Sequence, residues 1–383
     1  MLGVSELLSK VRGLRVGAIL NPTSVTPRLE HMADVLHGVP GVHLVHLFGP
    51  EHGIRGDVQY LEEVGEARDA RTGVPEHSLY GKDFASLTPR DEHLQDLDAL
   101  LFDVQDVGSR YYTYLATMGL AMQAAARRKL RFLVLDRPNP IGGNSVEGGV
   151  VQPGYESFVG LWPVCARHGL TAGEYAGFVN QGIGADLHVV RMEGWRRDMS
   201  FDDTRLPWVI PSPNMPTVET ALVYPGMCLL EGTNLSEGRG TTLPFLLFGA
   251  PWLDGQRLAE DLGREAIEGA RFRPCAFTPT WDKHKGQRCQ GVQIHLGYGR
   301  GLNAVRLGVA AVVHGRAQDP AKFRWRTEKY EFVEDKPAID LLTGSDAFRK
   351  RVEQGATVAQ LCDSWESERQ QFLQERERFL LYA

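Results

Sequence analysis

The chain has 383 residues, which is enough for two or three domains with a substantial hydrophobic core. Its net charge of −6 gives no electrostatic basis for nucleic-acid binding, because such binding usually needs a basic excess. The five cysteines are widely spaced and form no CxxC pair, so we expect neither a disulfide framework nor a thiolate zinc site.

The N-terminal segment MLGVSELLSKVRGLRVGAIL lacks the charged stretch followed by an apolar stretch that marks a secretory leader. Its apolar residues 16–20 are also too few to span a membrane. We therefore expect a cytoplasmic protein without membrane contact. The alternative is an exported protein whose secretory leader is missing from this sequence.

Short apolar runs punctuate the first third of the chain, and each is nearly continuous, as is typical of strands buried on both faces. Helical patterns separate them, and the pattern over 26–38 places Thr26 at its N-cap and Pro27 in its first turn. Alternating strands and helices predict a parallel sheet with helices on both faces. The runs are LRVGAIL (14–20), VHLVHLF (42–48), DALLFDV (98–104) and RFLVLD (131–136).

The remainder of the chain is less regular. Thr171 and Glu174 predict the capped start of another helix, and ADLHVVRMEGW (185–195) predicts one more strand. Residues 206–245 are rich in proline and glycine, which is typical of a functional segment or a connector, and we place a domain boundary near Pro225. Beyond it we expect a helix at 256–269, strands at GVQIHL (291–296) and LGVAAVVH (307–314), and a charged helical tail.

Polar residues directly follow each of the early apolar runs. In open parallel sheets, ligands bind beyond the carboxyl ends of the strands, so we expect these polar clusters to converge on one crevice. For any single cluster, a turn that satisfies its own backbone is the alternative. In chain order the candidate residues are Asn21, Glu51, His52, Arg55, Gln105, Asp106, Arg110, Tyr111, Arg137 and Asn139.

Several kinds of site are disfavoured by missing motifs. The turn after the first apolar run contains no GxGxxG, and the chain contains no GxxxxGK[ST], so we expect no nucleotide cofactor. Neither HExxH nor a dense cluster with metal-ligand spacing occurs, so we expect no metal. The GxSxG motif of a serine-centred nucleophile elbow is also missing.

Carboxylates therefore become the candidates for chemistry. Glycosidic hydrolysis needs an acid that protonates the leaving oxygen, and usually a second carboxylate. Glu51 lies on a tight turn after a buried strand, where partial burial raises the pKa of a carboxyl group. Asp103, Asp106 and Asp136 are possible partners, although aspartates at strand ends also hold neighbouring loops.

Arginines near these carboxylates are candidates for binding a substrate carboxylate through a bidentate guanidinium fork. A salt bridge to a nearby aspartate is the alternative role for each. They are Arg55, Arg110, Arg137 and Arg239.

Long motifs in the chain resemble one bacterial family. They are FGPEHGIRGD, FDVQDVGSRYYTYLATM, LDRPNPIGG, MEGWRRDM, PSPNMPTVETALVYPGMCLLEGTNLSEGRGTTLPF and FTPTWDKHKGQRCQGVQIH. The resemblance is to the DUF1343 family, now named for exo-β-N-acetylmuramidase, and it runs from about Val16 to the last residues. It implies a Rossmann-like catalytic domain at 1–225. A smaller α+β domain at 226–383 would complete the cleft.

The resemblance implies an exo-acting glycoside hydrolase that releases N-acetylmuramic acid from the non-reducing end of peptidoglycan-derived glycans. It assigns the general acid/base to Glu51, and we take Asp106 and Glu237 as candidates for a second catalytic carboxyl group. A muramyl glycan or peptidoglycan fragment is then the expected partner. Its lactyl carboxylate would suit Arg55 and Arg110.

Two later segments are expected to reach into the cleft, 234–242 with Arg239 and 282–287 with His284. A glycine-rich connector and a solvated turn are the alternatives for these segments. Asn214 is either a sugar ligand or a turn former between prolines. A non-catalytic binding protein for muramyl sugars is the alternative function, and a hydrolase of another acidic sugar is a third.

Overall fold

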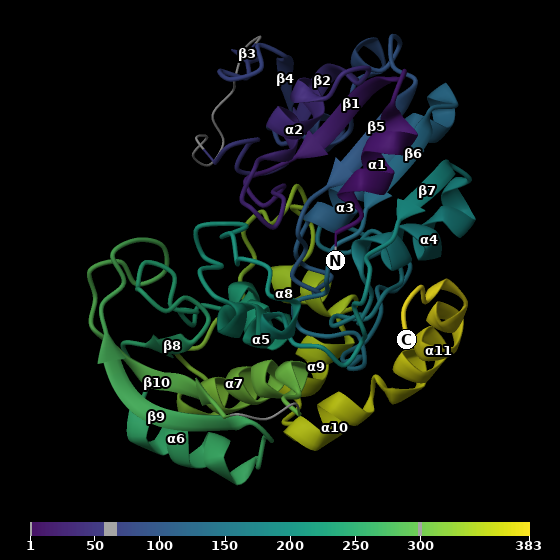
Figure 1. Ribbon diagram of the computed structural model, residues 1–383. Coiled ribbons are helices and arrows are strands. Elements are labelled where there is room, and N and C mark those ends of the chain that lie inside the picture. The colour runs from purple at the N-terminus through teal and green to yellow at the C-terminus, as the bar shows by residue number, and fades with distance from the viewer. Residues whose placement is uncertain (1, 57–66, 298–300) are drawn as a thin grey trace.

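The computed structural model describes residues 2–56, 67–297 and 301–383 (Figure 1). Within them, the larger sheet has seven strands in the order β3-β4-β2-β1-β5-β6-β7. Neighbouring strands are parallel except for β3, which is antiparallel to β4. The strands are β1 (Arg15–Leu20), β2 (His43–Gly49), β3 (Ala67–Arg68), β4 (Pro75–Ser78), β5 (Ala99–Asp103), β6 (Arg131–Leu135) and β7 (Asp186–Val190).

Helices cover both faces of this sheet, as the apolar runs predict. Val16 and Leu20 of β1 pack with helices α1 (Val4–Val11) and α2 (Met32–Gly38) in one hydrophobic cluster. Ile19 of the same strand faces the opposite layer, which contains α3 (Tyr114–Arg128) and α4 (Ala172–Ile183). Alternate side chains thus enter two cores, which explains why the strands are continuously apolar. We call this sheet with helices α1 to α4 the first domain.

The connection from β2 to β5 crosses over β1, because β2 and β5 pair with opposite edges of β1. The carboxyl ends of β1 and β5 therefore flank a topological switch point, where ligands bind in open α/β sheets. Thr23, after β1, accepts a hydrogen bond at Oγ1 from Gln105 N at 2.9 Å and so joins the two strand ends.

Helix α2 begins later than the sequence predicts. His31 is its N-cap and accepts a hydrogen bond from Ala33 N, so the predicted cap at Thr26 is wrong. Thr26 instead donates to Glu30 Oε2 at 3.0 Å and supports a turn before the helix. The capping box of Thr171 and Glu174 at the start of α4 is confirmed.

The smaller sheet is antiparallel, in the order β8-β10-β9, and with the helices around it forms the second domain. Its strands are β8 (Leu247–Ala250), β9 (Ala270–Phe277) and β10 (Cys289–Leu296). Helix α6 (Gly255–Arg264) packs against β9 and β10, while α5 (Val218–Met227) packs against α7 (Ala304–Gln318). Pro225, where we placed the boundary, lies inside α5.

The predicted strand at 307–314 is wrong, because these residues belong to helix α7. A continuous apolar run does not distinguish a buried helix from a buried strand. Asn303 caps the helix by accepting a hydrogen bond from Arg306 N at 2.8 Å. Helices α5 and α7 meet at glycines, since a Cβ on Gly308 would lie 2.0 Å from the carbonyl oxygen of Gly226.

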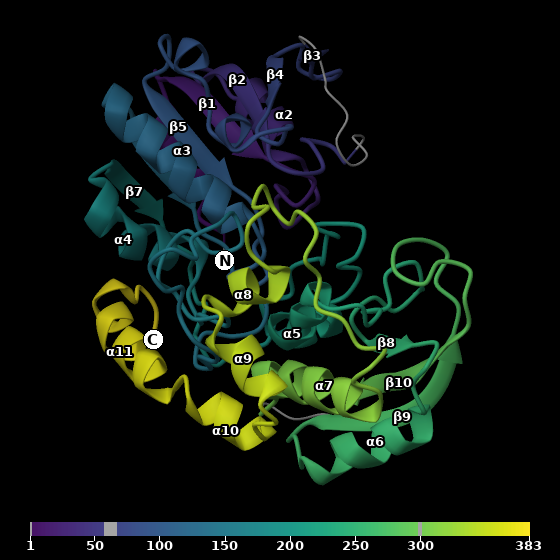
Figure 2. The ribbon, with the colours of Figure 1, turned by 180° about the vertical axis from the view of Figure 1, so that it is seen from behind.

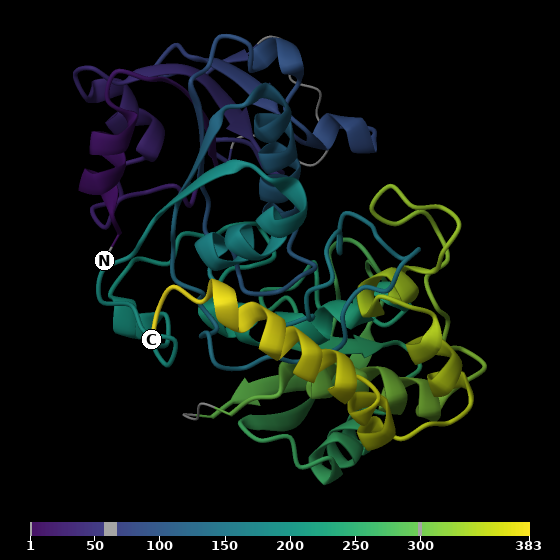
Figure 3. The same ribbon diagram turned by 90° about the vertical axis from the view of Figure 1, so that its right-hand side faces the viewer.

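The charged tail is helical, as predicted, and it returns to the first domain (Figure 3). Phe372 packs against Phe178 of α4 with ring centroids 5.4 Å apart. The helices are α8 (Ala338–Thr343), α9 (Ala347–Glu353), α10 (Val358–Asp363) and α11 (Glu366–Arg376). The 3-10 helices are η1 (Phe84–Leu87), η2 (Asp91–His93), η3 (Asp202–Thr204), η4 (Cys228–Gly232) and η5 (Glu377–Phe379). In the part of the chain that the structure describes, no helix is both long and apolar enough to cross a membrane.

Candidate active site

A tight turn follows β2 and carries Glu51. Gly53 N donates to Pro50 O at 3.0 Å, and His52 in the third position of the turn has a φ of 75°. Type II turns require such an angle there and normally use glycine. The turn folds back onto the strand, since a Cβ on Gly49 would lie 3.2 Å from Gly53 Cα. Asp57, at the end of the predicted GPEHGIRGD cluster, lies outside the described residues.

The Glu51 carboxyl group is largely buried, with 23% of its side chain exposed. Burial raises its pKa to about 7, opposed by the charge of Arg239 and assisted by that of Glu231. The group therefore keeps much of its proton near neutral pH. His52 Nε2 lies 3.9 Å from Glu51 Oε1, and burial together with Arg239 lowers the pKa of His52 to about 4. His52 is thus a neutral neighbour.

Arg239 of the second domain lies in a network of carboxylates. Its Nη2 donates to Glu231 Oε1 at 2.6 Å, and its Nε lies 3.2 Å from Glu237 Oε1. Lys283 Nζ donates to Glu237 Oε2 at 2.8 Å. Burial would raise the pKa of Glu231, but Arg239 and Lys283 outweigh burial and lower it. Charged groups of the second domain, Arg239 and Glu231, therefore act on Glu51 of the first domain.

Aromatic rings connect the two domains beside these charges. Tyr112 packs edge-on against Tyr224 at 5.7 Å, and Tyr224 packs against Phe245 at 4.9 Å. The Arg239 guanidinium lies over the Phe245 ring at 5.5 Å. Burial and the charge of Glu51 both raise the pKa of Tyr114, whose ring contacts Tyr112 at 5.0 Å.

The ends of β1 and β5 place further predicted residues at the sheet edge. Asn21 Oδ1 accepts from Thr23 N at 2.9 Å, and Gln105 Nε2 donates to Pro138 O at 2.8 Å. Asp106 Oδ2 accepts from Gly108 N at 2.6 Å. Burial raises the pKa of Asp106 to about 7, although the backbone N–H groups of Gly108 and Val107 oppose it.

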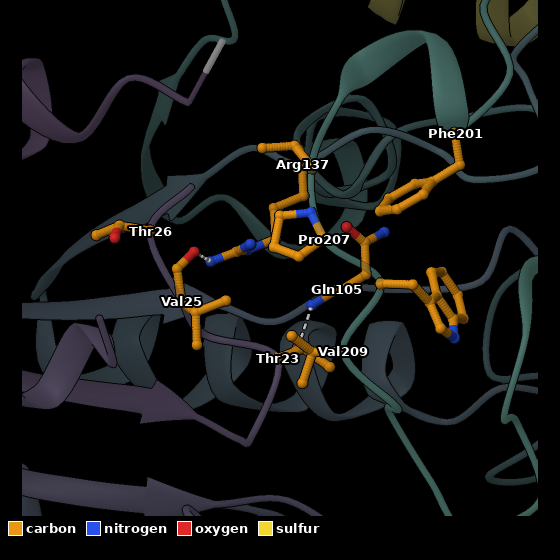
Figure 4. Close-up of a pocket in the computed structure, with 10 residues that line it drawn as sticks. Thr23, Val25, Thr26, Gln105, Arg137, Phe201, Pro207 and Val209 are labelled. Atoms are coloured by element: carbon orange, nitrogen blue, oxygen red, sulfur yellow. Dashed lines mark hydrogen bonds between the residues drawn. The ribbon is translucent and has the colours of Figure 1, made fainter. Parts of the chain in front are cut away.

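Arg137 and Gln105 line a small cavity of about 10 Å³, which is room for one water molecule at most (Figure 4). Arg137 also forms a bidentate pair with Asp103, with Nε–Oδ1 at 2.5 Å and Nη2–Oδ2 at 3.0 Å. The other residues around the cavity are Thr23, Val25, Thr26, Phe201, Leu206, Pro207, Trp208 and Val209.

Several predicted ligands are engaged within the protein. Arg55 pairs with Asp69 at 2.5 Å and Asp34 at 2.7 Å. Arg110 donates to the carbonyl oxygens of Gly149 at 2.8 Å and Leu342 at 2.6 Å. Arg55 thus forms the salt bridges that were its alternative role, whereas the acceptors of Arg110 are backbone carbonyl oxygens. Substrate binding by either arginine stays a prediction.

The remaining predicted residues have mixed surroundings. Tyr111 is buried, and the Arg110 guanidinium lies over its ring at 5.2 Å. Asn139 is buried and donates to Leu170 O at 2.9 Å. His284 Nε2 lies 2.7 Å from Asn234 O, and Asn214 is half-buried in a turn.

The sequence analysis missed three residues near this network. The charge of Glu231 assists burial in raising the pKa of Glu51, and the Tyr330 hydroxyl donates to Glu231 Oε2 at 2.9 Å. Burial and the charge of Glu51 raise the pKa of Glu331 to about 8. They lie in segments without helical or strand periodicity, so only their position in the fold identifies them. Within the described residues, no group of three or more His, Cys, Asp or Glu side chains is arranged to hold a metal ion.

Comparison with known proteins gives concordant matches over the whole chain. Residues 16–219 match the family model described as exo-beta-N-acetylmuramidase NamZ, N-terminal, and residues 222–382 match the corresponding C-terminal model. The peptidoglycan beta-N-acetylmuramidase NamZ of Bacillus subtilis (strain 168) is 45% identical over 386 residues, covering 99% of this chain and 91% of that protein.

Two crystal structures of DUF1343 family proteins from Bacteroides fragilis NCTC 9343 share the fold. Their TM-scores are 0.90 and 0.78, their sequence identities are 37% and 29%, and each match covers 100% of this chain and 98% of the other. The larger parallel sheet followed by a smaller antiparallel domain is thus the family architecture. The chain belongs to the NamZ family of exo-β-N-acetylmuramidases, which are glycoside hydrolases.

Proposed function

We propose that this protein hydrolyses the β-glycosidic bond of N-acetylmuramic acid in peptidoglycan-derived glycans and releases that sugar from the non-reducing end, with Glu51 as general acid/base. Family membership supports the reaction class. One observation carries the assignment of Glu51. Glu51 has a partly exposed carboxyl group at the carboxyl end of a parallel strand, and burial raises the pKa of this group to about 7.

The reaction requires a proton at the leaving oxygen. As the bond from the anomeric carbon breaks, the departing sugar oxygen becomes strongly basic, and a neutral carboxyl group within hydrogen-bond reach donates its proton there. Water adds to the anomeric carbon and loses a proton to a base. Such proton transfers contribute roughly 10²–10⁴ in rate.

Of the predicted second carboxyl groups, Glu237 has partners that suit a supporting role, whereas Oδ1 of Asp106 has no hydrogen-bond partner among the described residues. Both oxygens of Glu237 face cations, Lys283 at 2.8 Å and Arg239 at 3.2 Å. Asp106 is buried and its Oδ2 accepts a backbone hydrogen bond at 2.6 Å. Among the four predicted arginines, Arg239 is the one whose charge acts on Glu51, so we assign recognition of the lactyl carboxylate to it.

Glu51→Gln tests the assignment directly. We expect kcat on a muramyl disaccharide to fall roughly 10²–10⁴-fold, while the protein stays folded and keeps its affinity for N-acetylmuramic acid. Glu193→Gln, at an exposed glutamate, is the matched control and should leave kcat unchanged. Undiminished turnover of Glu51→Gln would remove Glu51 from the mechanism.

The two alternative functions give different results with the unmodified protein. A binding protein would retain muramyl sugars without cleaving them. A hydrolase of another acidic sugar would fail to release 4-nitrophenol from the N-acetyl-β-muramide. We expect release from the muramide and none from the corresponding N-acetylglucosaminide.

A further inference from the structure

Three histidine rings lie against one another where β4 pairs with β2. These two strands lie side by side near one edge of the larger sheet (Figure 2). Nε2 of His77 on β4 lies 3.0 Å from Nδ1 of His46 on β2. The ring of His93, from η2, stacks on the ring of His77 with centroids 3.7 Å apart and an interplanar angle of 17°. We call these three residues the histidine stack.

The strand pair that carries the histidine stack leads directly to the Glu51 turn. Phe48 of β2 pairs with His77 of β4, and their rings lie 5.3 Å apart. The pairing of β2 with β1 ends at Phe48, whereas the next residue, Gly49, accepts a hydrogen bond from Leu79 N at 2.7 Å. The last residue of β2, two positions before Glu51, is therefore held from the β4 side.

The contact between His46 and His77 requires that one of the two facing nitrogens lacks a proton. A neutral imidazole has one donor and one acceptor nitrogen, but a protonated imidazole has two donors and no acceptor. One proton can settle on His46, because its Nε2 lies 3.3 Å from Asp96 Oδ1. A further proton on His77 would place two donors face to face, and a proton on the stacked His93 ring would add a like charge.

The charged groups around the histidine stack offset these added charges only in part. They are Asp96, Glu92 and Arg90. Glu92 lies 3.5 Å from His93 Nε2, but its side chain is 62% exposed and also lies 3.5 Å from Arg90. Burial and then the charge of His93 lower the pKa of His77 to about 4, and burial lowers the pKa of His93 against the charge of Glu92. The packed arrangement therefore favours neutral rings.

We propose that the histidine stack is an acid-sensitive latch, which holds β4 against β2 while its rings are neutral and releases the end of β2, with the Glu51 turn, when they are protonated. Release stops turnover, and it is reversible because proton uptake breaks no covalent bond. The effect on turnover rests on the proposed function of Glu51, whereas the effect on the strand pair does not.

The sign of the pH dependence follows from the lowered pKa of His77. Its ordinary value is 6.5, so the unfolded chain takes up this proton more readily than the folded protein does. The stability that depends on a neutral His77 is complete above pH 6.5 and is lost as the pH falls toward 4. The latch should therefore be closed at pH 7 and weakened at pH 5.

A double variant that cannot take up these protons tests the proposal. His77→Gln keeps a side chain that can bond to His46, and His93→Phe keeps an aromatic ring. Between pH 7 and pH 5, the melting temperature of the double variant should fall less than that of wild type, by roughly 3 °C. His43→Gln, at an exposed histidine of the same strand, is the control and should follow wild type.

Hydrogen exchange locates the change in the β2–β4 pair. After correction for the intrinsic pH dependence of exchange, the protection of the Leu79 amide should fall roughly tenfold in wild type between pH 7 and pH 5 and stay constant in the double variant. Turnover of a muramyl disaccharide should fall over the same range in wild type, return fully at pH 7, and fall less in the double variant. His93→Phe alone should show about half of each effect, and it replaces the double variant if that protein does not fold.

Two results separate this inference from the proposed function. Equal pH dependence of the melting temperature and of Leu79 protection in wild type and variants would overturn the latch and leave Glu51 in place. Full activity of Glu51→Gln would refute the proposed function, while the pH dependence of Leu79 protection would still show whether the histidines hold the strands.

Discussion

The carboxyl edge of the larger sheet has two halves that treat polar side chains differently. After β5 and β6, the carboxylates of Asp103 and Asp136 are occupied, whereas Oδ1 of the buried Asp106 has no hydrogen-bond partner among the described residues. Asp103 pairs with Arg137 at 2.5 Å, and Asp136 Oδ2 accepts from Thr171 at 2.7 Å and from Tyr382 at 2.6 Å. After β2, the one ion-pair contact of Glu51 among the described residues is with His52, at 3.9 Å.

Both halves look alike in sequence, because each has polar residues directly after an apolar strand. The two halves differ in whether their buried polar atoms have hydrogen-bond partners. Buried polar groups with complete partners hold loops together, whereas a buried carboxyl group with none lowers stability and indicates function. Substitutions should therefore reduce stability in the closed half, after β5 and β6, and activity in the open half, after β2.

Arg137→Ala should have the largest effect on folding. It leaves Asp103 charged and unpaired in the core, and we expect a loss of about 3–5 kcal/mol in the free energy of unfolding, measured with urea. Arg15→Ala is the matched control, since Arg15 makes a similar bidentate pair with Asp98 at the surface, where solvent screens the pair, and its loss should cost far less. A large rise in KM for folded Arg137→Ala would show that the closed half also binds substrate.

Glu51→Gln should alter how stability depends on pH. The folded-state pKa of Glu51, about 7, exceeds its ordinary value of 4.5, so its contribution to stability is complete below pH 4.5 and is lost as pH rises through 7. The variant lacks this loss and should be more stable than wild type at pH 8, by up to about 3 kcal/mol, with no difference at pH 4. Parallel stability curves for the two proteins would contradict the assigned burial of Glu51.

Asn139→Ala tests a predicted ligand in the closed half. It removes the hydrogen bonds to Leu170 O at 2.9 Å and from Ile141 N at 3.1 Å, so we expect a loss of about 1–3 kcal/mol without a change in KM. Asn144→Ala, at an exposed asparagine of the same loop, should leave both quantities unchanged. Thermal unfolding and initial-rate kinetics measure them.

His52→Gly should have the smallest effect on stability and a clear effect on activity. Glycine relieves the positive φ of 75° but is more flexible when unfolded, so the net gain should be at most about 1 kcal/mol. Lys129→Gly relieves a φ of 56° at the exposed end of α3 and should give a similar gain. Only His52→Gly should lower kcat, because it loosens the turn that holds Glu51. Equal activity of both variants would show that the turn is rigid without His52.

Much of the first domain was predictable, because strands buried on both faces leave continuous apolar runs. Helix α7 was not, because its residues from Leu307 to His314 are equally apolar and many are β-branched. The helix is favoured by the cap at Asn303 and by the close contact between Gly226 and Gly308. That contact is visible only in the three-dimensional structure.

The candidate site was predictable in part, because the apolar strands that lead to it are recognisable in the sequence. Glu51 follows a recognisable strand, so its position at the sheet edge follows from the fold. Glu331 lies in a two-residue loop between Tyr330 and Val333, whose backbone groups pair with each other. Its sequence gives no turn signal, since glutamate and phenylalanine replace the usual Asn-Gly. The charge of Glu51 acts on Glu331 only because of how the chain packs in three dimensions.

The return of the C-terminal segment to the first domain affects whether that domain can fold without it. Tyr382 binds Asp136, the backbone N–H of Leu381 donates to Glu174 at 2.9 Å, and Phe372 covers Phe178. A fragment ending at residue 219 would match the N-terminal family model yet lack part of its own core and two of its internal hydrogen-bond donors. The part of the chain that matches the N-terminal model therefore relies on the C-terminal segment for some of its packing, and we expect a polypeptide cut between the two matched regions to have a less stable first domain.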